Sequence, residues 1–175
     1  AYEIKECDWS SDVCSSDLAD GQVTAGNACP LNDGAAAVVV MSDTKAAELG
    51  ITPLARIVAS GVSALNPEIM GLGPIDASRQ ALARAGLTID DIDLVEINEA
   101  LAAQVLPSAK HLGIPMEKLN VHGGGIALGH PFGMTGARIM TTLINGLETE
   151  GGRYGLETMC VGGGQGMAMI VERLS

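Results

Sequence analysis

Three residues in the second half of the chain combine side chains and settings suited to acid–base chemistry. His130 stands between Gly129 and Pro131, and Cys160 is followed directly by VGGGQG. An imidazole titrates near neutrality, so His130 could move a proton or donate to a developing oxyanion. Backbone N–H groups of a glycine turn could stabilise a thiolate beside Cys160, whose thiol could then exchange a proton or attack a carbonyl. Asn98, in EINEA, lies where a predicted strand gives way to a helix.

Each candidate also has a structural interpretation. Asn is a favoured N-cap, so Asn98 alone is better explained as the cap of the following helix. His130 alone fits a structural histidine as well as a catalytic one. Buried cysteines are usually inert, which is the structural interpretation of Cys160, and Cys29, in GNACPLNDG, is interpreted as a structural cysteine. His111 is interpreted as a solvated helix residue and His122 as a strand residue. The three histidines lack Cys or carboxylate companions at metal-ligand spacing, so no metal site is predicted.

The elements that must position these residues alternate between strand and helix. Strands are predicted over 54–64 and 93–98, a strand entering a glycine-rich turn over 119–131, and two strands joined by a glycine turn over 155–174. Helices are predicted over 76–85 (capped by Asp76 and ended by Gly86), over 99–113 (kinked or divided by Pro107) and over 133–151. The last helix has Ile139, Leu143 and Leu147 at four-residue spacing.

The first part of the chain carries weaker signals. The run AAAVVVMS at 35–42 predicts either the end of a helix or a buried strand, followed by a short capped helix over 42–50. Residues 66–74 are predicted to form a loop. Alternating strands and helices favour a layered α/β fold, in which ligands bind where strands end in glycine-rich loops.

Composition and charge exclude several classes of partner. The net charge is −11 and no run of Lys and Arg occurs, which argues against nucleic acid and anionic membranes. No apolar run approaches the ~18 residues of a membrane span. Four cysteines without framework spacing indicate a reducing compartment, so a cytoplasmic location is expected.

Five short motifs occur in the order found in the C-terminal half of a thiolase: TAGNACPLNDGAAA at 24–37, MGLGP at 70–74, NEA at 98–100, GHP at 129–131 and CVGGGQG at 160–166. The chain resembles that family over about residues 19–175. The resemblance implies the C-terminal half of a layered αβαβα fold, with a mixed sheet and helices on both faces. Residues 19–52 would be the remnant of the loop region and the end of the N-terminal half, and 53–175 the C-terminal domain.

The resemblance also implies a chemistry. Thiolases transfer an acyl group to coenzyme A, cleaving or forming a 3-oxoacyl-CoA by Claisen chemistry, with coenzyme A and acyl-CoA as substrates and no covalently bound cofactor. Asn98 would hold a water that forms one oxyanion hole with His130, and His130 would also help to activate a nucleophilic cysteine. Cys160 would be the general acid/base, and the N–H of Gly162 would contribute to a second oxyanion hole. The residues expected to border coenzyme A are Cys29, Met70 and Ala100.

The chain departs from the family pattern in three places. Cys29 replaces the usual Ser of GNAS, which bears on a coenzyme A hydrogen bond, and Leu101 replaces the usual Phe after NEA. The family's nucleophilic cysteine lies in an N-terminal half that this chain is expected to lack. That half is therefore an expected partner, and the parent enzyme is expected to be a homodimer or homotetramer.

Two further expectations follow for the chain by itself. An apolar face left uncovered should make it associate, and it should show no turnover. The alternative is a non-catalytic thiolase-like module that binds an acyl-CoA, a lipid-CoA or a partner subunit. The presence together of Asn98, His130 and Cys160 argues against that module.

Residues 1–18 are interpreted as a non-native leader. One codon series for the stretch from Cys7 to Leu18 resembles a sequencing-library adapter read through in one frame. Cys14 does not suit the missing nucleophile, because Asp17 stands where a glycine is expected. Cys7 and Cys14 have no second pair and no nearby histidine to complete a metal site.

Overall fold

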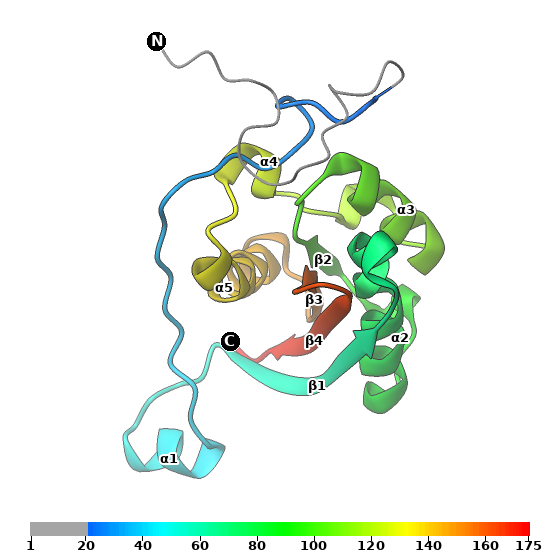
Figure 1. The fold of residues 1–175 in the computed structure, drawn as a ribbon. Coiled ribbons are helices and arrows are strands. Elements are labelled where there is room, and N and C mark those ends of the chain that lie inside the picture. Colours follow the sequence, from blue (N-terminus) through cyan, green and yellow to red (C-terminus); the bar gives the residue numbers. More distant parts are fainter. Residues whose placement is uncertain (1–20) are drawn as a thin grey trace.

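The computed structural model describes residues 21–175, in which four strands form one mixed sheet in the order β1-β4-β3-β2 (Figure 1). β4 pairs antiparallel with both β1 and β3, whereas β2 and β3 are parallel. The strands are β1 (Ala55–Ala64), β2 (Leu94–Ile97), β3 (Tyr154–Val161) and β4 (Gln165–Arg173). The predicted leader at residues 1–18 lies outside the described residues.

Helices lie on both faces of the sheet, as expected for the fold class (Figure 1). α2 (Gly73–Ala85) packs on β1 and β4, with α3 (Ala102–Leu112) beside it, whereas α5 (Phe132–Glu150) covers β2 and β3 on the opposite face. One apolar cluster joins α2 and α3 to the sheet, and a second joins α5 to it. β2 is buried along its whole length because it lies between these layers.

α5 forms where the four-residue spacing predicted a helix. Ile139, Leu143 and Leu147 are buried against the sheet, and Gly151 ends the helix in the left-handed region at φ 71°. α5 is the longest helix among residues 21–175. The predicted helix over 133–151 is therefore confirmed to within one residue at each end.

α2 begins earlier than its predicted cap. Pro74 stands in the first turn, Leu72 occupies the N-cap position, and Asp76 lies inside the helix, where its carboxylate contacts Arg79 at 3.1 Å. A proline at the first turn is already set for helical φ, and its missing N–H costs nothing there. Asp76 as the cap was therefore wrong, whereas Gly86 ends the helix as predicted.

The start of α3 contradicts the predicted cap. Asn98 is not an N-cap, because α3 begins only at Ala102. Residues 100–102 instead pair with 27–29: Cys29 N–H donates to the Ala100 carbonyl at 3.0 Å and Ala102 N–H to the Asn27 carbonyl at 2.8 Å. This pairing keeps the backbone extended past the end of β2. The helix continues through Pro107 as one element, so of the predicted kink or division, the division does not occur.

The segment after α3 is less regular than predicted. The expected strand near residue 119 is a single bridge between Leu119 and Val95, and His122 lies in a turn rather than a strand. Two short elements follow α3: a 3-10 helix, η4 (Met116–Lys118), and α4 (Gly125–Leu128). His130 therefore follows a one-turn helix, not a strand.

The remaining short elements lie in the first half of the described residues. The loop expected at 66–74 contains a 3-10 helix, η2 (Pro67–Leu72), and η3 (Ile89–Asp91) precedes β2. Residues 35–42 form neither a helix nor a buried strand but an exposed, extended segment. α1 (Asp43–Glu48) follows it, and the Ser42 hydroxyl accepts from Lys45 N–H as an N-cap, as predicted for a short capped helix. None of the helices within residues 21–175 is long and apolar enough to cross a membrane.

Candidate functional site

The ends of β2 and β3 and the start of α5 lie at the same end of the sheet. Ile97 is the register partner of Thr158, so Asn98, just after β2, and Cys160, near the end of β3, lie at the same end of the sheet. α5 runs in the opposite direction, because its last turns lie beside the start of β2: a Cβ at Gly146 would stand 3.1 Å from Leu94 Cδ1. The start of α5, and His130 just before it, must therefore lie toward the ends of the two strands.

His130 is held in one tautomer by the first turn of α5. Its Nδ1 lies 2.6 Å from Thr135 Oγ1, and that hydroxyl donates its one proton to the Pro131 carbonyl at 3.0 Å. Thr135 must then accept from the imidazole, so Nδ1 carries the proton and Nε2 is left with a free lone pair. A neutral imidazole with Nε2 free can act as a general base.

The surroundings of His130 keep it neutral and fixed in place. Burial, and then the positive charge of Arg138, lower the pKa of His130. The Phe132 ring lies against the imidazole at a centroid distance of 4.8 Å. Gly129, at φ 92°, leaves no room for a Cβ because the Asn32 side chain fills that space.

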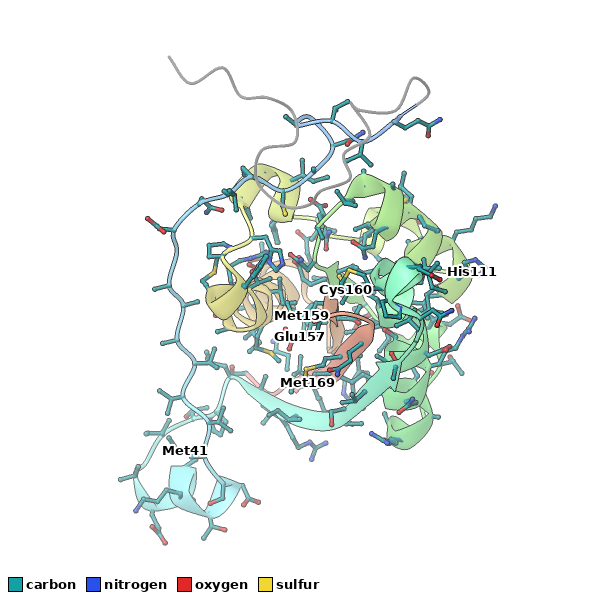
Figure 2. The ribbon with its side chains drawn as sticks, in the orientation of Figure 1. Met41, His111, Glu157, Met159, Cys160 and Met169 are labelled. Carbon is teal, nitrogen blue, oxygen red and sulfur yellow. The ribbon has the colours of Figure 1, made fainter. Side chains whose placement is uncertain are left out.

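Cys160 lies near the end of β3, just before the glycine turn that leads into β4, and it pairs with Gly166 (Figure 2). Burial raises the pKa of the Cys160 thiol, although its hydrogen bonding to the backbone opposes the shift. The turn therefore does not produce the thiol of near-neutral pKa that its glycines suggested. Cys160 is a protonated thiol at neutral pH, suited to donating a proton and to acting as a strong base once deprotonated.

Asn98 is fully buried and follows the last residue of β2. Its backbone N–H donates to the Thr158 carbonyl at 3.0 Å, which continues the β2–β3 pairing by one residue. Its side-chain Oδ1 and Nδ2 have no hydrogen-bond partner among residues 21–175. Leaving a buried amide without hydrogen-bond partners is costly. The Asn98 side chain can therefore bind a water or a substrate oxygen.

Two residues that the sequence reasoning passed over build the frame around Asn98. Asn120, in the left-handed region at φ 46°, exchanges hydrogen bonds of 2.9 Å with both backbone groups of Ile97. Glu99 accepts from Asn120 Nδ2 at 2.9 Å and from Ile126 N–H at 3.1 Å, which ties α4 to the end of β2. The only sequence signal for this frame was the position of Glu99 inside NEA.

Of the residues expected to border coenzyme A, Met70 lies in η2, whereas Cys29 and Ala100 lie outside the helices and strands. Cys29 is buried and pairs through its backbone with Ala100. Burial raises the pKa of Cys29, and a smaller contribution comes from the negative charge of a Cys160 thiolate, so the two cysteines lie close enough to interact electrostatically. Met70 is half-buried in η2, and Gly162 is exposed in the turn after β3 at φ 56°.

A buried charge cluster under α5 was not predicted. Arg138 Nη1 lies 3.5 Å from Glu96 Oε2, and Glu96 is the register partner of Glu157. Burial raises the pKa of Glu96 to about 7 and that of Glu157 to about 8, while the Arg138 charge opposes both shifts. Figure 2 shows Glu157 on β3 near Cys160, with Met169 of β4 beside it. The sequence contained no signal for these contacts, because they join residues far apart in the chain.

The other histidines lie apart from this site. His111 is exposed on α3, as predicted, and Figure 2 shows it on the outer side of that helix. His122 is exposed in its turn. Over residues 21–175, no group of three or more His, Cys, Asp and Glu side chains is placed to hold a metal ion.

The fold and the site define a layered α/β domain in which a thiol, an imidazole and an unpaired amide gather at one end of a mixed sheet. Two protein-family models match the chain. The model "Thiolase, C-terminal domain" matches residues 51–173, and the model "Thiolase, N-terminal domain" matches residues 16–44. The chain belongs to the thiolase family.

Individual relatives agree with that assignment. The chain is 58% identical over 156 residues to an acetyl-CoA acetyltransferase of Syntrophomonas wolfei, covering 88% of this chain and 39% of the relative. It is 56% identical over 161 residues to a 3-ketoacyl-CoA thiolase of Cronobacter sakazakii, covering 90% and 42%. The chain therefore spans about two fifths of the length of these relatives.

Solved structures show the same fold. The acetyl-CoA acetyltransferase of Bacillus anthracis superposes with a TM-score of 0.86 at 48% identity, covering 94% of this chain and 44% of that one. The human mitochondrial 3-ketoacyl-CoA thiolase in complex with CoA superposes with a TM-score of 0.83 at 46% identity, covering 89% and 40%.

Proposed function

We propose that this chain contributes the acid–base half of a thiolase site, which transfers an acyl group to coenzyme A by cleaving or forming a 3-oxoacyl-CoA. The observation that carries the proposal is the Thr135–His130 hydrogen bond, which leaves Nε2 of His130 free at the end of the sheet where Cys160 also lies. Membership of the family and the CoA complex of a structural relative support coenzyme A as the substrate.

The proton chemistry follows from the two environments. In the cleavage direction, the Cys160 thiol gives its proton to the carbanion that forms as the carbon–carbon bond breaks. In the synthetic direction, the thiolate removes that proton, and its raised pKa makes it the stronger base. His130 Nε2 takes the proton of a thiol nucleophile, because its own lowered pKa keeps the imidazole neutral.

Oxyanion stabilisation is assigned to Asn98, His130 and Gly162. The unpaired amide of Asn98 would hold a water that forms the first oxyanion hole together with His130, whose Nε2 donates once it has taken the proton of the nucleophile. The N–H of Gly162, in the exposed turn after β3, would contribute to the second. Cys29, Met70 and Ala100 would border coenzyme A. In this arrangement a buried Cys29 thiol offers a much weaker hydrogen bond than the hydroxyl of the usual serine.

We further propose that turnover needs the part of the relatives' length that this chain does not match, in the same subunit and within a homodimer or homotetramer. That part would supply the nucleophilic cysteine. The domain organisation expected from the sequence, with 19–52 as the end of the N-terminal half and 53–175 as the C-terminal domain, is kept as part of this proposal. The cytoplasmic location rests on cysteine spacing alone.

The experiment is complementation. The chain is mixed with a separately produced N-terminal half of the Syntrophomonas wolfei relative, and acetoacetyl-CoA cleavage is measured with each part alone and with both. We expect cleavage only in the mixture, and a loss of about 10²–10⁴-fold in the Cys160→Ala and His130→Ala variants. Thr141→Val, on the exposed side of α5, is the matched control.

Two outcomes would contradict parts of the proposal. Cleavage by this chain alone would overturn the need for the other half. Coenzyme A binding without cleavage in a mixture shown to assemble would favour the non-catalytic module instead.

A further inference from the structure

Glu96, Glu157 and Arg138 form a compact cluster between the sheet and α5. Glu96 and Glu157 lie directly opposite each other on the parallel strands β2 and β3. Arg138 reaches Glu96 from α5 at 3.5 Å, and the two side chains are only 13% and 4% exposed. Three charges from three different elements are therefore enclosed where water is scarce.

Hydrogen bonding within this cluster is incomplete. Arg138 Nε, Nη1 and Nη2, Glu96 Oε2 and Glu157 Oε2 are buried without a hydrogen-bond partner among the described residues. Two carboxylates and one guanidinium would leave a net charge of −1 in a low-dielectric layer, which is costly. One proton on the pair of carboxyl groups makes the cluster neutral. Glu96 has the guanidinium as its ion-pair partner, so Glu157 is the better proton carrier.

The cluster is also connected to the imidazole. Arg138 lies one helical turn after Thr135, whose hydroxyl holds His130 Nδ1. A guanidinium that cannot lose its charge, fixed at this point, opposes formation of an imidazolium. Glu96 is the ion-pair partner of the buried guanidinium, and the proton on Glu157 prevents a second negative charge from offsetting the Arg138 charge.

We propose that Arg138 is a positioning residue that keeps His130 neutral, and that the Glu96–Glu157 pair carries one proton, on Glu157, which preserves this effect. What the neutral imidazole does in catalysis rests on the proposed function. The proton and the charge effect do not, so they can be tested without coenzyme A.

The charged groups that shift the pKa of each member of the cluster come from α5, from β2 and from the loop after β2. The charge of Arg138 lowers the pKa of Glu96, and the charge of Glu99, in the loop after β2, raises it. The charge of Glu96 raises the pKa of Glu157, and that of Arg138 lowers it. Arg138 is the charged group that acts on His130, after burial. Removing the Arg138 charge should therefore raise the His130 pKa while leaving the effect of burial in place.

The first test is a histidine titration by NMR in the 175-residue chain, whose three histidines allow complete assignment. In Arg138→Met we expect the His130 midpoint to rise by about half a pH unit or more, roughly a threefold change in proton affinity. Arg138→Lys should restore the lower midpoint in part, and Arg79→Met, an exposed arginine on α2, should leave it unchanged. An unchanged midpoint in a folded Arg138→Met protein would overturn the charge effect.

The second test does not require an Arg138 variant to fold. Infrared spectra of the wild-type chain labelled with ¹³C-carboxyl glutamate should show the C=O stretch of a protonated carboxyl group at pH 7. This band should disappear in Glu157→Gln and persist in Glu148→Gln, an exposed position on α5. Absence of the band from the wild-type protein, or its persistence in Glu157→Gln, would overturn the assignment of the proton. Neither test depends on turnover, so failure of the proposed function would be seen separately.

Discussion

At the scale of single residues, the hydroxyl of Thr135 determines what His130 can do. The Thr135 hydroxyl donates its one proton in a hydrogen bond to the Pro131 carbonyl. Towards the imidazole, the hydroxyl oxygen can therefore act only as an acceptor. A valine in its place would keep the shape but remove the acceptor. The free nitrogen of His130 would then no longer be specified.

We predict that Thr135→Val mixes the two tautomers of His130. The ¹⁵N shifts of the imidazole should move from a single Nδ1–H form towards an average of both forms. In the complemented enzyme, cleavage should fall by roughly 10–100-fold, a loss of about 1.4–2.7 kcal/mol in transition-state stabilisation. Thr141→Val, which removes a hydroxyl bonded only to the Ala137 carbonyl of the same helix, is the control. Unchanged ¹⁵N shifts in Thr135→Val would contradict the assigned tautomer.

The buried carboxyl groups give the stability of the chain an unusual pH dependence. The folded state raises the pKa of Glu157 from 4.5 to about 8, so it binds a proton more tightly than the unfolded state between these values. Stability should therefore fall as pH rises through this window, by up to about 1.4 kcal/mol per pH unit for one such group.

We predict that Glu157→Gln flattens this decline between pH 5 and 8, because the amide cannot ionise. Urea unfolding at a series of pH values measures the slope, with Glu148→Gln as the exposed control. A wild-type chain whose stability is constant or rises over this window, with an equal slope in Glu157→Gln, would show that Glu157 ionises freely in the folded state.

At the scale of the elements, the periodic helices were predictable and the connections between them were not. The spacing of Ile139, Leu143 and Leu147 is a local property of the sequence, and the structure buries that face as expected. The pairing between residues 27–29 and 100–102 delays the start of α3 to Ala102, so Asn98 does not cap that helix. No local pattern in the sequence shows this pairing. A favoured N-cap residue was therefore taken for a cap.

The same reason explains the difference near residue 119. The sequence favoured a strand, but Asn120 uses its side chain to bond the end of β2 in place of a backbone ladder. Hydrogen bonds from a side chain that replace those of a strand backbone form only through tertiary contact. For the candidate site, His130 and Cys160 stood out by their glycine surroundings and received their roles from the family resemblance, whereas Arg138 and its carboxyl partners are visible only in three dimensions.

We predict that Asn120→Ala costs about 2–4 kcal/mol of folding stability. Alanine would lose the hydrogen bonds to Ile97 and Glu99, leave buried backbone groups unpaired, and strain a left-handed backbone position. Denaturant unfolding measures the loss, and Asn66→Ala, whose side chain makes no cap hydrogen bond, is the control. Equal effects of the two substitutions would show that Asn120 is not a structural junction.

At the scale of the whole molecule, α5 covers only part of one sheet face. Val62 and Met167 are register partners on β1 and β4, face away from α2, and are 52% and 48% exposed. Ile57, also on β1, is similarly exposed. In Figure 1, β1 lies away from α5, so the face of β1 opposite α2 is not covered by that helix. The extended segment at 35–42 adds further apolar surface, with Val39 85% exposed. Apolar surface of this kind favours association.

We predict that the chain self-associates at micromolar concentration, and that Val62→Lys combined with Met167→Lys shifts the equilibrium towards monomer. Sedimentation velocity over a concentration series measures the change. The control is Thr141→Lys, which adds a charge on the exposed side of α5. A wild-type chain that sediments as a single monomer at all concentrations would contradict the expected association.

The exposed stretch at 35–42 is also the place where the chain can be divided. It connects Cys29, held by its backbone against Ala100, to all the elements that carry Asn98, His130 and Cys160. One proteolytic cut there would leave the candidate site on two peptides that, within the described residues, are joined only by non-covalent contacts, with Cys29 on the shorter one. Whether the shorter peptide stays bound after such a cut would measure directly how much the short pairing of 27–29 with 100–102 contributes to holding the site together.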